Sequence, residues 1–307
     1  NREGSKIQNG QISSVALMDA RSIAATAANK GYLTSATDLA DIEYTHPKYF
    51  FDKAIYDRRV YNGVGKADPS VEIKFGPNIK DWPEMVPLTD NLLLKVASVI
   101  HDPVTTTDEL IPSGETSSYR SNPLGLAEFT LSRKDPEYVG RAKAIQAVEK
   151  VREAGECMGK AFPEVKKVMH AIKEKFDDVC GSNTGVGSTI YAVKPGDGSA
   201  REQAASCQKV LGGWANIAKE YATKRYRSNL INWGMLPFVI DKDFDFDNDD
   251  YVFIPGIKDA VKNKTEVIKA YVVNKNFAEI ELRLGELTDD ERQIITDGCL
   301  INYYKYN

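Results

Sequence analysis

The sequence lacks the features on which several classes of protein depend. Its four cysteines, Cys157, Cys180, Cys207 and Cys299, show no C-x-x-C spacing, and its three histidines are isolated from one another and from the cysteines. Neither a disulfide framework nor a zinc site is therefore expected, and no metal site is expected in this chain. No apolar run approaches the roughly 20 residues of a membrane span, and no signal peptide is recognisable. These absences favour a cytoplasmic protein with reduced thiols.

An excess of positive charge is also missing. The 307 residues carry a formal net charge of -4, which gives no global attraction to nucleic acid or to an anionic membrane. What is present is the composition of an ordinary globular protein, with 42% hydrophobic and 27% charged residues. The length allows one large domain or two smaller ones, and no internal repeat divides it.

One stretch, residues 194–211 (KPGDGSAREQAASCQKVL), combines a turn with the start of a helix. The turn is G-D-G, and helical periodicity begins at the serine that follows it, Ser199. The first-turn N–H groups of such a helix favour small anions such as carboxylates, and Arg201 adds a planar bidentate donor. An alternative interpretation involves no chemistry, because Ser199 with Glu202 three residues later matches a capping box.

A second stretch pairs a buried strand with a polar loop. Residues 92–100 (LLLKVASVI) form the apolar run of a buried strand, and TTTDELIPSGETSSYRSN follows them. Loops that follow strands often carry ligand-binding residues, and Asp108 and Arg120 are the candidates in this loop. From the residues alone, Asp108 can equally close an Asx-turn, and Arg120 can pair with surface acids.

The remaining periodicities indicate a mixed α/β chain. Near its beginning, Asp19 and Gly31 bracket a helix. Near its end, KTEVIKAYVVN and FAEIELRLG alternate as a hairpin does, and a last helix opens with a capping box from Thr288 to Glu291. Between these segments the patterns predict helices over 141–156, 163–176 and 223–233, and strands over 187–193, 214–218 and 251–254.

Two local patterns point to other functions. KEYATKRYR, residues 219–227, interleaves basic residues with Tyr221 and Tyr226 as a nucleic-acid surface would, but the chain as a whole is acidic and such binding is not expected. DKDFDFDNDD, residues 241–250, alternates acids, but no frame supplies both the glycine and the glutamate of a calcium loop. An exposed acidic loop is the expectation there.

GDGSAREQAA, continuing through GGWANIAKEYATKRYRSNLINWGMLPF, resembles the swivel domain of the aconitase family. In that family the pattern G-x-G-S-S/A-R-E carries the serine that serves as catalytic base, which gives that role to Ser199 and substrate binding to Arg201. A family strand also runs into T-T-D with an arginine twelve residues beyond the aspartate, and Asp108 and Arg120 keep that spacing. NREGSKIQNGQ resembles the end of the third aconitase domain, where Arg2 occupies the position of a second substrate-binding arginine.

The resemblance implies an organisation for the whole chain. The expected fold class is α/β, with the swivelling three-layer β/β/α domain of the aconitase C-terminal type, preceded by a short piece of the third domain and a linker. The expected boundaries are 1–45 for the piece of domain 3, 46–90 for the linker and 91–307 for the swivel domain. The implied partner is the rest of an aconitase-like chain, domains 1 to 3, and no membrane is implied.

The implied function is that of the C-terminal part of an aconitase-like hydratase, a hydro-lyase that dehydrates and rehydrates a hydroxy di- or tricarboxylic acid. Ser199 would remove a proton from the carbon next to a carboxylate, and Asp108 would orient or buffer catalytic groups. The substrate carboxylates would be bound by Arg120, Arg201 and Arg2. Hydroxide would leave at an iron of a 4Fe-4S cluster, whose cysteine ligands this chain does not contain, so the fragment alone is expected to be inactive.

Departures from the family pattern leave the substrate open. Ile111 stands where the T-T-D segment of the family often carries a serine, with Ser113 as a shifted substitute, and Ala200 replaces the second serine of the family's G-S-S-R. The likeness is therefore to a hydratase branch other than citrate-isomerising aconitase. Two further hypotheses are a non-catalytic RNA-binding module and a structural or regulatory domain that binds small di- or tricarboxylates.

Overall fold

The computed structural model describes residues 16–38, 45–59, 63–72 and 74–306. The chain divides into two compact units, one that ends at Lys74 and one that runs from Phe75 to Asn307. The described residues of the first unit form three short helical elements, which are α1 (Ala20–Ala28), the 3-10 helix η1 (Ala36–Asp38) and α2 (Lys53–Arg59).

The helix predicted between Asp19 and Gly31 is confirmed as α1. Asp19 caps it, because its carboxylate accepts hydrogen bonds from the backbone N–H groups of Arg21 and Ser22. Gly31, just beyond the helix, has a φ of 91°, a left-handed value that glycine adopts without strain. The helix therefore begins and ends for local reasons that are visible in the sequence.

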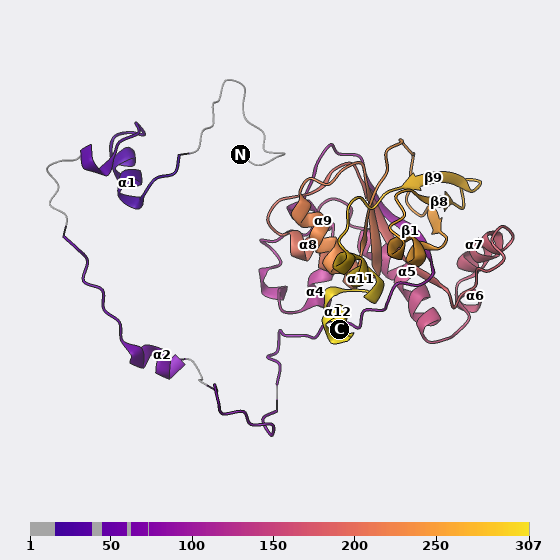
Figure 1. Ribbon diagram of the computed structural model, residues 1–307, viewed down its shortest axis with the longest axis horizontal. Helices are drawn as coiled ribbons and strands as arrows, with labels where there is room; N and C mark the ends of the chain where they lie inside the picture. The colour runs from indigo at the N-terminus through magenta and orange to yellow at the C-terminus, as the bar shows by residue number, and fades with distance from the viewer. Residues whose placement is uncertain (1–15, 39–44, 60–62, 73, 307) are drawn as a thin grey trace. The chain divides into compact units, whose positions relative to one another are not determined.

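The second unit is built on a seven-stranded mixed sheet with the order β6-β5-β3-β1-β7-β8-β9 (Figure 1). The four strands from β6 to β1 run parallel, whereas β7, β8 and β9 are antiparallel to their neighbours. The strands of this sheet are β1 (Asn91–Ile100), β3 (Thr184–Ala192), β5 (Gly213–Ala218), β6 (Leu236–Val239), β7 (Tyr251–Ile254), β8 (Ile268–Val272) and β9 (Ala278–Leu282).

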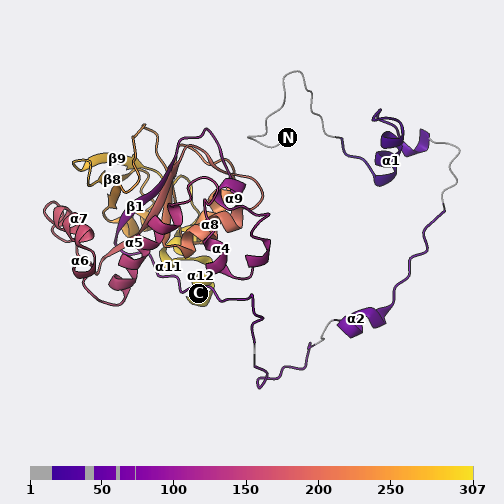
Figure 2. The same ribbon diagram turned by 180° about the vertical axis from the view of Figure 1, so that it is seen from behind.

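Helical elements connect and cover these strands, and α4, α8 and α9 lie side by side in both views of the molecule (Figure 1, Figure 2). The elements are α3 (Thr107–Leu110), η2 (Ser117–Tyr119), α4 (Pro123–Ala127), α5 (Tyr138–Glu153), α6 (Met158–Ala161), α7 (Pro163–Lys173), α8 (Arg201–Val210), α9 (Lys224–Asn232), α10 (Ile257–Lys262), α11 (Asp289–Asp297) and α12 (Leu300–Tyr306). The predicted α/β fold class is confirmed.

The central strand β1 is buried on both of its faces. Leu92 packs in one apolar cluster with Ile257 of α10, and its neighbour Leu93 packs in another cluster with Ile145 of α5. Because successive side chains of a strand point to opposite faces, helices must cover both sides of the sheet here. This double burial explains why residues 92–100 are mostly apolar, and the strand predicted there is confirmed.

The segment that precedes β1 also packs on the second unit. The rings of Trp82 and Trp233 have centroids 4.4 Å apart, and Leu88 is 1% exposed. The backbone N–H of Leu88 donates to the carbonyl of Thr296 at 3.0 Å. Residues 75–90 are therefore part of the compact unit that contains the sheet, while the domain boundaries at 45/46 and 90/91 stay predictions.

Several local predictions can be compared with the structure. The hairpin is confirmed as β8 and β9, and the capping box from Thr288 to Glu291 is confirmed at the start of α11. The helix predicted over 141–156 covers Tyr138–Glu153 instead. It ends earlier because Gly155, with a φ of 75°, turns the chain out of the helix.

Candidate active site

Two loops that are far apart in the sequence meet through the small parallel sheet of β2 (Thr105–Thr106) and β4 (Pro195–Asp197). The pairing sets Thr105 beside Pro195 and Thr106 beside Asp197. The chain runs from β2 directly into the T-D loop and from β4 directly into the G-S-A-R turn. The two motifs that carry the sequence resemblance therefore lie at one place in the fold.

Gly198 makes the close approach of these two loops possible. A Cβ atom at this position would lie 2.0 Å from Oγ1 of Thr107, and the φ of Gly198 is 144°. Any larger residue would meet both a steric clash and an unfavourable backbone conformation. The second glycine of the G-D-G turn is thus required by the contact with the loop that begins at Thr107.

Replacing Gly198 with alanine is therefore expected to destabilise the chain by about 2 kcal/mol or more, because the turn must open or the Thr107 loop must move. Urea unfolding of the two proteins measures this difference. The matched control is Gly114→Ala, in a loop where an added Cβ atom meets nothing within 4 Å. Equal unfolding midpoints for the Gly198 and Gly114 variants would contradict the assigned contact.

Ser199 and Arg120 line one cavity of about 220 Å³. The two residues are far apart in the sequence and come from the two loops that the small sheet joins. Within the same wall, Ile111 is completely buried and forms an apolar surface. The cavity is lined by Ile111, Ser113, Thr116, Arg120, Leu126, Ser199, Ala200 and Gln203.

The prediction that Ser199 and Glu202 form a capping box is wrong. The N-cap of α8 is Ala200, one residue later, and the helix start has no side-chain cap. Glu202 points elsewhere, because its carboxylate accepts hydrogen bonds from the side chains of Trp233, at 2.6 Å, and Asn229. The Ser199 hydroxyl makes no hydrogen bond with any described residue, so it and the first-turn N–H groups are available beside the cavity.

Arg120 is exposed and makes no hydrogen bond or ion pair within the described part of the chain. Pairing with surface acids, which the residues alone left open, does not occur among those residues. An unpaired guanidinium beside the start of α8 makes this cavity attractive to a carboxylate, because both the helix dipole and the side chain favour negative charge.

The structure does not place Arg201 in the wall of this cavity. Its guanidinium donates a hydrogen bond to the carbonyl oxygen of Gly198, three residues earlier. The side chain is half-buried and fastens the turn to the first residue of α8. Arg201 therefore stabilises the turn that presents Ser199.

Asp108 lies next to the cavity but does not line it. Its carboxylate pairs with Arg133, with Nη1 and Oδ2 2.7 Å apart, and accepts a hydrogen bond from the backbone N–H of Ser113 at 3.2 Å. Arg133 also pairs with Glu115 at 2.6 Å, and these carboxylates raise the pKa of its guanidinium. Asp108 therefore orders the loop that carries Ser113, which does line the cavity. Arg2 lies outside the described residues.

Sequence reasoning missed two residues at this site. Arg133 follows Asp108 by 25 positions, and no local spacing rule connects them. Gln203 lies one helical turn beyond Ser199 and lines the cavity, so the period of the helix could have found it. A smaller adjoining cavity of about 70 Å³ shares Arg120 and Gln203 with the first and extends to Trp82.

The described residues offer no site for a metal ion, since they contain no group of three or more histidine, cysteine, aspartate or glutamate side chains suited to one. No cysteine lines the cavity of Ser199. The nearest candidate in sequence, Cys207, is buried, and burial raises the pKa of its thiol to about 12. These residues do not fit an iron-sulfur cluster. Among the helices of the described ranges, none is long and apolar enough to cross a membrane.

Comparisons with known proteins agree with the sequence resemblance. Residues 180–243 match the family of the aconitase C-terminal domain. The chain is 30% identical over 131 residues to aconitate hydratase A of Rickettsia bellii, which is 40% of this chain and 15% of that protein. It is 34% identical over 110 residues to the methanogen homoaconitase small subunit of Methanocaldococcus jannaschii, which is 36% of this chain and 56% of that protein.

A crystal structure of a 3-isopropylmalate dehydratase from Methanocaldococcus jannaschii aligns with 70% of this chain and 93% of its own, with 22% identity and a TM-score of 0.43. A likeness at this level carries no argument about function. The chain is thus similar, over residues 180–243, to the C-terminal domain of aconitase, and the matched relatives are named as an aconitate hydratase and a homoaconitase small subunit. It spans less than two thirds of either curated relative.

Proposed function

We propose that the chain supplies the C-terminal swivel part of an aconitase-like hydro-lyase that dehydrates and rehydrates a hydroxy di- or tricarboxylic acid. The observation that carries the proposal is that Ser199 and Arg120 line one cavity at the start of α8. In the proposed reaction, the alkoxide of Ser199 takes a proton from the carbon next to a carboxylate that Arg120 holds. Arg201 and Asp108 position the two loops, and Arg2 remains a proposed second carboxylate ligand.

A serine hydroxyl is normally a very weak base, so the site must stabilise its alkoxide. Two features at Ser199 favour the negative charge, namely the first turn of α8, which has no side-chain cap, and the unpaired guanidinium of Arg120. The hydroxyl itself is not engaged with another described residue. This combination is what a general base at this position requires.

The apolar part of the cavity lining favours a particular kind of substrate. Ile111 is fully buried and Leu126 is 4% exposed, and both line the cavity. A third carboxylate against this wall would be desolvated without a partner, which is costly. A hydroxy dicarboxylic acid with a hydrocarbon substituent therefore fits this proposal better than citrate.

The remainder of the site is proposed to come from a partner, either preceding domains of the same chain or a separate large subunit. The first unit exposes several large apolar side chains, among them Tyr32, Leu33, Tyr49 and Phe50, each at least 75% exposed. Such side chains need cover from another surface. A 4Fe-4S cluster, which the resemblance implies, would then be held by that partner, because the cavity described here has no cysteine.

The RNA-binding alternative finds little support in the basic segment. Tyr226 is fully buried and its hydroxyl accepts hydrogen bonds from Gln208 and Asn216. Lys219 pairs with Asp243, with the charged atoms 2.7 Å apart. Tyr226 and Lys219 are therefore committed to the fold. Lys224 and Arg225 of this segment are exposed, but no exposed aromatic ring of the segment accompanies them as a stacking platform for bases.

Replacing Arg120 with glutamine is expected to raise KM for the hydroxy acid by about thirtyfold, because the carboxylate loses its charged partner. Steady-state kinetics of the enzyme assembled with its partner measure the change. The matched control is Arg225→Gln, an exposed arginine in α9. A KM that moves equally in both variants, or in neither, would contradict the assigned role.

A further inference from the structure

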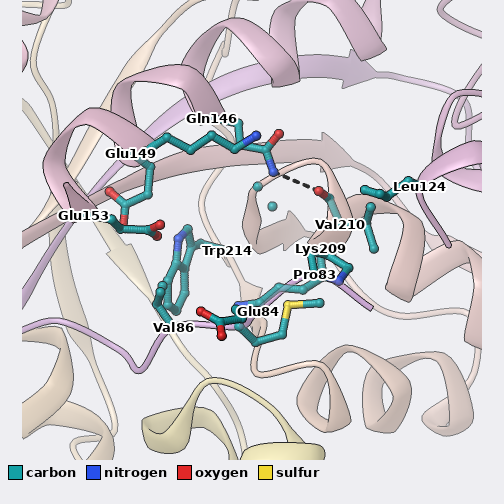
Figure 3. A pocket seen from close by; sticks show the side chains of 14 residues that line it. Pro83, Glu84, Val86, Leu124, Gln146, Glu149, Glu153, Lys209, Val210 and Trp214 are labelled. Atoms are coloured by element: carbon teal, nitrogen blue, oxygen red, sulfur yellow. Dashed lines mark hydrogen bonds between the residues drawn. The ribbon is translucent and has the colours of Figure 1, made fainter. Parts of the chain in front are cut away.

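A second cavity, of about 140 Å³, lies where residues 83–86 pass α5 and the end of α8 (Figure 3). It shares no lining residue with the cavity of Ser199. On one side, Nε2 of Gln146 donates to the carbonyl of Val210 at 2.8 Å and ties α5 to α8.

Lys209 is a buried cation without a hydrogen-bond acceptor in this cavity. The residue is 6% exposed, and its Nζ atom is buried and bonded to no described residue. Nζ lies over the ring of Trp214, 3.7 Å from the centroid, which offsets part of the charge. Burial lowers the pKa of Lys209 to about 8. A buried donor that no oxygen satisfies points to an acceptor supplied by a ligand.

Carboxylates face the same cavity. Glu149 is committed to the fold, because it accepts hydrogen bonds from Arg152 and from the backbone N–H of Val186 at 2.7 Å. Glu153 and Glu84, in contrast, make no hydrogen bond or ion pair with a described residue, although both line the cavity. Burial and the neighbouring Glu149 raise the pKa of Glu153. In Figure 3 the carboxylates of Glu153 and Glu84 lie on either side of the Trp214 ring.

Charges of both signs therefore border one small space. A simple carboxylate would pair with Lys209 but would be repelled by Glu84 and Glu153. A simple amine would pair with these glutamates but would be repelled by Lys209. A molecule that carries both an ammonium and a carboxylate satisfies both sets of groups. Trp214 and the apolar walls at Val86 and Val210 would cover a short hydrocarbon side chain.

We propose that this cavity binds a small zwitterion, an α-amino acid with a short apolar side chain, whose carboxylate accepts hydrogen bonds from Lys209 and whose ammonium faces Glu153. The size agrees, because a cavity of about 150 Å³ in another protein holds one benzene-sized ligand. L-valine, with a branched hydrocarbon side chain, is a suitable probe.

Titration calorimetry on the full chain tests the proposal with L-valine and two matched analogues. Isovalerate lacks the ammonium, and isobutylamine lacks the carboxylate. L-valine is expected to bind at least about tenfold more tightly than either analogue, since each lacks one of the two charge interactions. An analogue that binds as tightly as L-valine, or no binding of L-valine at millimolar concentration, would overturn the proposal.

Variants locate the site. Lys209→Met and Glu153→Gln are each expected to weaken L-valine binding at least about tenfold, whereas Lys167→Met, which removes an exposed lysine of α7, should leave it unchanged. Unaltered binding in the Lys209 and Glu153 variants would overturn the assignment. If Lys209→Met does not fold, Glu153→Gln and the analogue series decide the matter alone.

Discussion

Replacing Ser199 with alanine is expected to lower kcat of the complete enzyme by about a thousandfold or more, because the reaction loses the group that takes the proton. KM should change little, since Arg120 and the first turn of α8 still bind the carboxylate. Steady-state kinetics with the hydroxy acid measure both constants. The control is Ser118→Ala, an exposed serine in η2, for which normal kinetics are expected.

The free energy of unfolding of Ser199→Ala distinguishes a catalytic role of Ser199 from a structural one. A serine that caps a helix costs about 1 kcal/mol when it is replaced by alanine. Because Ala200 is the N-cap of α8 and Ser199 makes no hydrogen bond with a described residue, Ser199→Ala should leave the free energy of unfolding unchanged. A loss of stability with near-normal turnover would show that Ser199 is a cap and not a base.

Replacing Lys209 with methionine is expected to stabilise the chain by about 3 kcal/mol at neutral pH. Methionine fills a similar volume and carries no charge, and the figure follows from a folded-state pKa of about 8 against about 10.5 for an ordinary lysine. Urea unfolding measures the effect, and Lys167→Met again serves as the control. A destabilised Lys209→Met variant would show that the ammonium, with Trp214, makes a net favourable contribution.

The difference in the free energy of unfolding between the wild-type chain and Lys209→Met should change with pH in one direction. The folded-state pKa of Lys209 lies below its unfolded value, so the unfolded state binds more protons between the two values. The wild-type chain should therefore gain about 2 kcal/mol relative to Lys209→Met from about pH 7 to about pH 9.5. The comparison with the variant removes the contributions of other groups, such as Tyr138 and Tyr226, which titrate at higher pH. A difference that does not change with pH would contradict the lowered pKa.

The sequence predicted those helices and strands that follow from a local signal or from a periodic pattern of apolar residues. The apolar run over 92–100 predicted β1 because both faces of that strand are buried, and the alternation near the end predicted β8 and β9. A local pattern gave a wrong prediction at Ser199, because the spacing of a capping box is present in the sequence but no capping box forms. There, Glu202 is held by Trp233 and Asn229, 31 and 27 residues away, and these tertiary hydrogen bonds outweigh the local one.

The sequence predicted the two motifs of the candidate site, but it did not predict that they lie next to each other in the fold. The pairing of β2 with β4 brings them together, and each of these strands is too short to stand out in a sequence. Lys209 could not be found at all, because its position in α8 resembles any other helical lysine. Its burial depends on Trp214 and on residues 83–86, which only the fold brings to it.

Exchange of the substrate proton with solvent tests the central claim most directly. In deuterium oxide, the assembled enzyme should exchange the proton on the carbon next to the carboxylate, as NMR of the hydroxy acid would record. Ser199→Ala should bind the hydroxy acid with nearly the same affinity and show exchange slower by about a thousandfold or more. Exchange at the wild-type rate in Ser199→Ala would contradict the assignment of Ser199 as the base.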